Sequence, residues 1–88
     1  MKDSARQAEI EILKYLIAHQ EARDTVEGIE KWWLPQSRQY GMADIVAALR
    51  HLEERDLVRV WKSASAKPVY GRSPAVPRAM EDYLRSLE

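Results

Sequence analysis

The sequence predicts one mainly α-helical domain, residues 1–88, that carries a small β-hairpin. Apolar residues recur at helical spacing in the first twenty residues and again between residues 42 and 55. After Leu57 the period changes to two, as in a half-buried strand. A chain of 88 residues is long enough for one core. We therefore expect a three-helix core, a two-stranded hairpin and a C-terminal helix.

The first helix is expected over residues 4–20. Ser4 and Gln7 have the spacing of a capping box, in which each side chain satisfies a backbone amide at the helix start. Behind them lies an apolar face formed by Ile10, Ile12, Leu13, Leu16 and Ile17. This face is wide enough for a central core helix.

The second helix is expected over residues 25–34 and is short. Thr25 is a suitable N-cap, and Val26, Ile29 and Trp33 follow at spacings of three and four. Pro35 should stop this helix, and residues 34–41 should form a loop.

The third helix, residues 42–55, runs into the hairpin, residues 57–72. Ile45, Leu49 and Leu52 form one apolar stripe on the helix. Asp56 follows the helix, at a position where a left-handed residue is expected. In the hairpin, two alternating strands should flank a flexible turn over residues 63–67.

A final helix is expected over residues 77–87, with Pro77 as its first residue. Its apolar side consists of Met80, Leu84 and Leu87, with Tyr83 adjacent. So short a helix is not stable alone, so it must pack on its own domain or on a partner.

Positive charge is concentrated in the hairpin region, although the whole chain has no net charge. Residues 57–80 contain five basic residues and no acid, whereas residues 1–56 contain eleven acids and eight basic residues. The hairpin cations can neutralise phosphates. The alternative is that they only keep an edge hairpin soluble.

The composition excludes several classes of function. Without cysteine the chain has no disulfide and no thiolate zinc site, and it fits a reducing cytoplasm. No apolar run approaches the ~20 residues that span a bilayer, so we expect no membrane partner. His19 and His51 are expected to be ordinary surface histidines rather than metal ligands, and no cofactor is indicated. Catalytic motifs are missing too, so we do not expect an enzyme.

The segment LRHLEERDLV, residues 49–58, resembles the L-x-x-L-E-x-x-G-L-V segment of winged-helix transcription regulators of the ArsR, MarR and PadR kind. The resemblance implies a winged-helix fold, with the third helix in the major groove of duplex DNA and the hairpin as a wing on the adjacent backbone. Arg72 stands where such regulators often have an apolar residue, and the loop before the third helix is longer than usual. The expected DNA-binding residues are Arg38, Gln39, Arg50, Arg59, Lys62, Lys67 and Arg72.

The helix itself offers few residues that read bases. Opposite its apolar stripe lie Ala43, Asp44, Ala47 and His51. Arg50 is the one residue on it of the kinds that usually contact base edges. The alternative for this face is a solvated surface, or a flat surface that another protein can approach.

The sequence therefore supports two hypotheses. The first is a small DNA-binding transcriptional regulator that forms a homodimer through its first and last helices. The second is a winged-helix module that binds another protein, with Trp32 or Trp61 exposed at the contact and the basic hairpin incidental. The expected dimer or partner interface comprises Trp61, Met80, Tyr83, Leu84 and Leu87.

Overall fold

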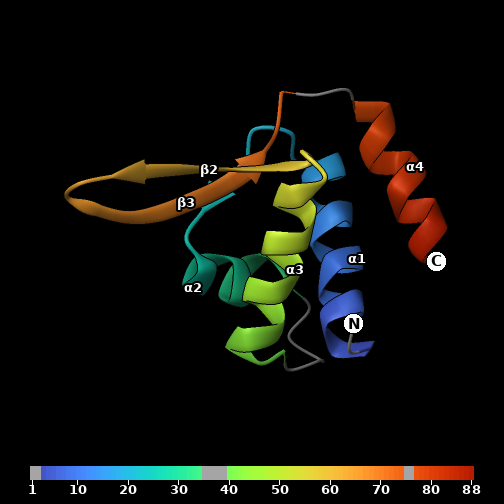
Figure 1. The fold of residues 1–88 in the computed structure, drawn as a ribbon, viewed down its shortest axis with the longest axis horizontal. Coiled ribbons are helices and arrows are strands. Elements are labelled where there is room, and N and C mark those ends of the chain that lie inside the picture. Colours follow the sequence, from blue (N-terminus) through green and yellow to red (C-terminus); the bar gives the residue numbers. More distant parts are fainter. Residues whose placement is uncertain (1–2, 35–39, 75–76) are drawn as a thin grey trace.

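The computed structural model describes residues 3–34, 40–74 and 77–88, which form a mostly helical fold with a three-stranded antiparallel sheet (Figure 1). The elements in chain order are α1 Asp3–Ala18, β1 Arg23–Asp24, α2 Val26–Gly28, the π-helical turn η1 Ile29–Trp33, α3 Met42–Glu54, β2 Val58–Ser63, β3 Ala66–Arg72 and α4 Pro77–Leu87. The β2–β3 hairpin projects from one side of the helices, and α4 lies on the other side (Figure 1).

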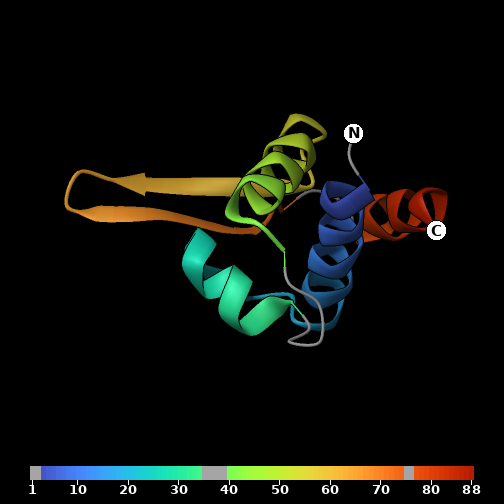
Figure 2. The same ribbon diagram turned by 90° about the horizontal axis from the view of Figure 1, so that it is seen from below.

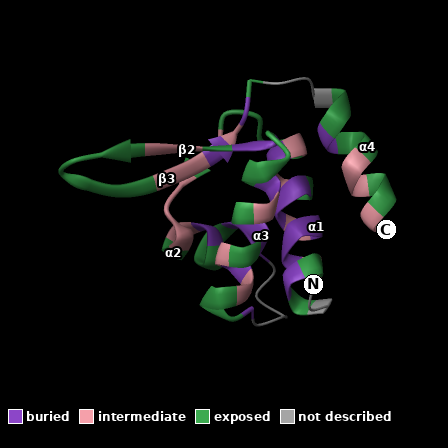
Figure 3. Ribbon diagram, in the orientation of Figure 1, coloured by how far each residue is buried: buried purple, intermediate pink, exposed green. Residues whose placement is uncertain are grey.

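Helix α1 is the centre of the core. It lies between α4 and the part of the fold formed by α2 and α3 (Figure 2), and its buried residues form a continuous face (Figure 3). Ile12, Leu13 and Leu16 are completely buried, which confirms the predicted apolar face. The helix spans residues 3–18 rather than 4–20, so Ser4 lies inside the helix instead of capping it.

Strand β1 was not predicted, so the expectation of a two-stranded sheet is wrong. Arg23 pairs with Gly71 and Asp24 with Tyr70, which gives the strand order β1-β3-β2. An Arg-Asp pair has no apolar alternation and little β propensity. Its extended conformation depends on the partner strand β3, which is about fifty residues away in the sequence.

The segment after β1 forms the predicted N-cap. The Thr25 hydroxyl accepts a hydrogen bond from the Gly28 amide at 3.2 Å. The helix that follows widens into a π-helical turn, in which Ile29 and Trp33 are buried. The Trp33 ring stacks on Tyr15 of α1 at a centroid distance of 4.9 Å, so this turn is fixed to the central helix.

Helix α3 ends in the left-handed conformation that was expected at Asp56, where φ is 60°. The Asp56 amide donates to the Glu53 carbonyl at 2.9 Å, and the Leu57 amide donates to the Leu52 carbonyl at 3.0 Å. These two bonds are those of a Schellman motif. The motif reverses the chain and places Leu57 in the core, where it is 5% exposed, before β2 begins.

The hairpin turn is tighter than expected. Ser63 pairs with Ala66, so the turn consists of residues 64–65 rather than residues 63–67. The register shifts between Trp61 and Ser63, so that Lys62 lies opposite both Lys67 and Pro68. Proline has no backbone N–H and is tolerated in a strand at such a bulge. The alternation-based prediction missed this irregularity because it assumed regular pairing.

Replacing Asp56 tests the end of α3. Asp56→Gly should raise the free energy of unfolding by about 0.5–1 kcal/mol, because glycine adopts positive φ without the steric cost of a Cβ. Asp56→Val should lower it, because a β-branched side chain is least compatible with this conformation. Urea unfolding followed by tryptophan fluorescence measures both changes, and equal effects of the two variants would contradict the assignment.

Candidate nucleic-acid interface

A polar groove lies between α3 and the hairpin. It has a volume of about 230 Å³ and is lined by Val46, Arg50 and Glu53 of α3 and by Val60, Lys62 and Tyr70 of the sheet. The three helical residues are four and three positions apart, which places them on one face of α3. Arg50 and Lys62 thus come from separate elements to one concave surface, with the acid Glu53 beside them.

The two faces of the hairpin differ because side chains alternate along a strand. Val60 and Lys62 face α3, whereas Arg59 and Trp61 belong to the opposite face. Arg59 is exposed there. Within the described ranges, neither Arg59 nor Lys62 forms an ion pair. Their charges are therefore available to an external anion on both faces of the hairpin.

Lys67 differs from these two residues because its charge already has a partner. Its Nζ donates to Oε2 of Glu27 at 2.8 Å. The pKa of the Glu27 carboxyl is lowered, chiefly by this hydrogen bond. The sequence showed Lys67 as one of several hairpin cations, and it gave no sign that an acid of α2 would lie next to it.

Arg72, another predicted DNA-binding residue, is not in the groove lining. Arg72 is half-buried and pairs with Val58 at the base of the hairpin, far along the strand from the turn. Arg38 and Gln39 lie outside the residues that the structure describes. Of the five predicted residues that the structure describes, Arg50 and Lys62 line the common groove.

Trp61 is half-buried within its own chain. The guanidinium of Arg23 lies over its ring, 4.0 Å from the centroid. Gly71 leaves the space for this contact, because a Cβ there would lie 2.8 Å from Cγ of Arg23 and 3.1 Å from the Trp61 ring. Trp61 therefore holds β1 against the hairpin by packing against a basic side chain of its own chain.

Trp32 is the tryptophan that is exposed, at 68% of its surface. It lies on η1, and the Lys31 Nζ is 5.3 Å from its ring centroid. The expectation that at least one of Trp32 and Trp61 would be exposed is confirmed by Trp32. Ala43 and Ala47 of α3 are also exposed, as expected.

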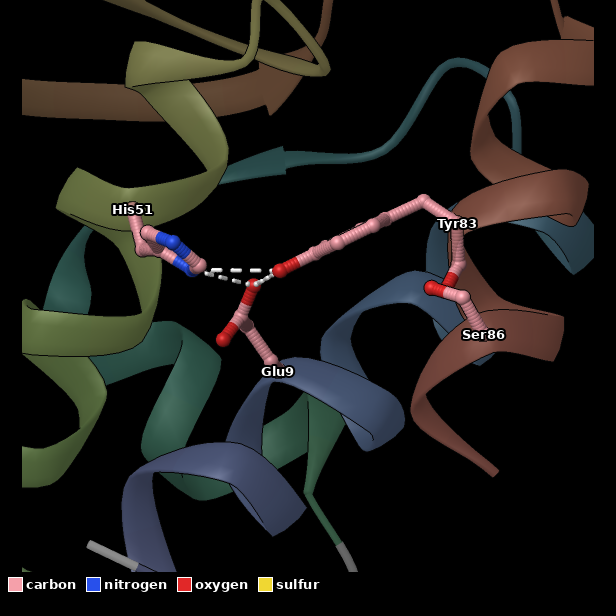
Figure 4. Close-up of polar contacts among 4 residues, drawn as sticks. All are labelled: Glu9, His51, Tyr83 and Ser86. Atoms are coloured by element: carbon pink, nitrogen blue, oxygen red, sulfur yellow. Dashed lines mark hydrogen bonds and ion pairs between the residues drawn. The ribbon is translucent and has the colours of Figure 1, made fainter. Parts of the chain in front are cut away.

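A buried polar cluster joins three helices on the other side of α3. Glu9 of α1 is completely buried, and its Oε1 lies 2.9 Å from Nδ1 of His51 on α3 (Figure 4). The Tyr83 hydroxyl of α4 donates to the same oxygen at 2.8 Å and lies 3.2 Å from Nδ1 of His51. Because Tyr83 donates its own proton to Glu9, its hydroxyl oxygen is free to accept from His51. A proton on Nδ1 of His51 can therefore be shared between the Glu9 Oε1 and the Tyr83 hydroxyl oxygen.

The cluster corrects the prediction that His51 is an ordinary surface histidine. The His51 side chain is 34% exposed and borders the buried stripe of α3 on the side toward α1. Glu9 carried a signal that the sequence reasoning passed over, because it is an acid at a core position of α1, four residues before Leu13. Its second oxygen, Oε2, is buried and has no hydrogen-bond partner among the described residues.

Tyr83 has an altered environment in this cluster. Its pKa is raised to about 12, first by burial and then by the hydrogen bond to Glu9, because both disfavour the phenolate. The guanidinium of Arg55 lies 4.3 Å from the ring centroid, on α3's C-terminal side. Tyr83 therefore remains a hydrogen-bond donor over the whole neutral range.

The other predicted interface residues of α4 face their own chain. Met80 is 2% exposed and belongs to the core, and Leu84 and Leu87 are partly buried against it. Arg6 of α1 also donates to the Leu87 carbonyl at the end of α4. Packing of α4 on its own domain is thus the observed arrangement, and a contact of this helix with a partner stays a prediction.

Comparison of the chain with protein-family models, curated proteins and solved structures finds no match. Across the ranges 3–34, 40–74 and 77–88, no three or more His, Cys, Asp or Glu side chains are placed to hold a metal ion. In those same ranges, each helix is too short or too polar to cross a membrane.

Removing the Tyr83 hydroxyl tests the electrostatics of the cluster. The phenol ionises near pH 10 when unfolded but near pH 12 when folded, so its contribution to stability is complete below pH 10 and is lost between pH 10 and 12. The difference in unfolding free energy between the wild type and Tyr83→Phe should fall across this interval by on the order of 1–2 kcal/mol, since solvent screening reduces the full effect.

Urea unfolding at pH 8, 10, 11 and 12 measures this difference. Tyr70→Phe removes a phenol outside the cluster and is the matched control. A Tyr83→Phe curve that runs parallel to the wild-type curve over the whole range would contradict the proposed role of the phenol.

Proposed function

We propose that the chain is a small winged-helix protein that binds duplex DNA and acts as a transcriptional regulator in the cytoplasm. One observation carries the proposal: Arg50 of α3 and Lys62 of β2 line the same groove. Two cations on facing walls suit the phosphates of one DNA strand passing between a helix and a hairpin.

The distribution of charge supports the same function. The hairpin projects from the helices (Figure 1), and Arg59 is exposed on its far face. Glu53 reduces the positive potential of the groove, since a carboxylate repels phosphate. We therefore propose a binder of moderate affinity, in which the hairpin and the C-terminal half of α3 contribute more than the small residues Ala43 and Ala47.

We also propose that the functional unit is a homodimer. A twofold-symmetric pair would place two hairpins on successive half-sites of DNA. The resemblance of residues 49–58 to the ArsR, MarR and PadR regulators supports this assembly by analogy.

The groove cations give the direct test. Fluorescence anisotropy on random-sequence duplex at about 50 and 200 mM salt should show binding that weakens steeply with salt. The double variant Arg50→Gln/Lys62→Gln should weaken binding uniformly across sequences. It should also reduce the slope of log K against log salt by about two, one for each phosphate that is no longer neutralised.

Arg78→Gln is the matched control, because Arg78 is exposed on α4, across the molecule from the hairpin (Figure 1). It removes the same type of charge without touching the groove, and it should leave the slope unchanged. If the wild type does not bind duplex at low salt, the DNA-binding proposal is wrong.

The exposed ring of Trp32 favours a second candidate, a module that binds another protein. Tryptophan is enriched among the residues that dominate the energy of protein interfaces. For this candidate, Trp32→Ala should abolish capture of a partner while Arg50→Gln/Lys62→Gln leaves it intact, and binding should depend weakly on salt. If the protein instead binds DNA, Arg50→Gln/Lys62→Gln should weaken binding and Trp32→Ala should leave it intact.

A further inference from the structure

We infer that Glu27 is an internal competitor for DNA phosphate and that its contact with Lys67 restrains DNA binding by the hairpin. This inference rests on the proposed function, because it concerns the hairpin that we propose to contact DNA. It adds an autoinhibitory contact, in which the Glu27 carboxylate forms an ion pair with the Lys67 ammonium group that phosphate would otherwise bind.

The geometry of the pair supports competition. The Lys67 Nζ and the Glu27 Oε2 are 2.8 Å apart, the length of a charge-assisted hydrogen bond. The two side chains are 73% and 50% exposed, so a phosphate can approach the ammonium group from solvent. The lowered pKa of Glu27 agrees with this arrangement, because the contact with Lys67 favours the carboxylate.

The backbone holds Glu27 in this position. Thr25 caps α2 through the Gly28 amide, and the Asp24 carboxylate accepts a hydrogen bond from the Thr25 amide at 2.8 Å. The Asp24 side chain fills the space that a Cβ at residue 28 would need, so Gly28 permits this close approach. Since Asp24 also pairs with Tyr70, the turn that carries Glu27 is fixed to strand β3.

Lys67 is placed by the same strand. It lies beside Pro68 in the bulge of β3 that faces Lys62. Lys67 forms an ion pair with Glu27, whereas Arg59 and Lys62 of the same hairpin form none with a described residue. A phosphate that approaches Lys67 has to share the ammonium group with the Glu27 carboxylate or displace it.

A double-mutant cycle tests this inference. Glu27→Gln should tighten binding to random-sequence duplex at low salt by about two- to fivefold, the range expected when an exposed ion pair no longer competes. In a Lys67→Gln background, the same Glu27→Gln change should have an effect no larger than that of the control change Glu30→Gln. The measurement is again anisotropy, with circular dichroism to verify that each variant is folded.

Glu30→Gln is the matched control. Glu30 is an exposed acid three residues further along the same helical segment and makes no ion pair with a described residue. Its removal changes the net charge equally, so any general electrostatic gain appears in both variants. A gain for Glu27→Gln that exceeds the Glu30→Gln gain only when Lys67 is present supports the inference.

Two results would overturn it and are distinguishable from each other. Equal gains for Glu27→Gln and Glu30→Gln, with DNA binding intact, would show a general charge effect and leave the proposed function standing. If neither the wild type nor Glu27→Gln binds duplex at low salt, the proposed function is wrong, and the inference is overturned with it.

Discussion

The buried carboxylate of Glu9 is the constraint on which the arrangement of the helices depends. Removing a carboxyl group from water costs free energy, and the hydrogen-bond partners that offset part of this cost at its Oε1 are His51 of α3 and Tyr83 of α4. The apolar face of α4 alone permits sliding and rotation of so short a helix. A hydrogen bond to a completely buried oxygen permits neither, so the cluster sets the rotation of both helices about α1.

The rotation of α3 decides what this helix presents to the hairpin. Successive helical residues differ by about 100° in direction, so fixing His51 toward α1 turns its neighbour Arg50 toward the groove. The other wall of the groove is fixed separately. Trp61 packs under Arg23 across Gly71, which joins the hairpin to strand β1. Two independent anchors thus hold Arg50 and Lys62 on facing walls.

Sequence reasoning succeeded for most local features, although the expected cap at Ser4 and the expected length of the hairpin turn were wrong. The spacing of α3, the cap at Thr25, the left-handed Asp56 and the limits of α4 each follow from residues within one or two turns. It failed where a feature depends on a distant partner. Strand β1 exists because of β3, and Lys67 is neutralised by an acid forty positions away. The groove was predicted in part. The sequence analysis named its cations Arg50 and Lys62 as DNA-binding residues, but the position of Glu53 beside them follows only from the packing of α3 against the hairpin.

The lack of net charge has a physical consequence for any binding of nucleic acid by this chain. With 14 basic and 14 acidic residues, long-range attraction to DNA is weak, so attraction has to arise at short range, where local groups dominate. At that range individual acids matter as much as individual bases. Glu53 lines the groove beside Arg50, and Glu27 forms an ion pair with Lys67. An acid-free hairpin sequence therefore overstates the positive charge that a phosphate would meet, because the fold brings acids from α2 and α3 next to it.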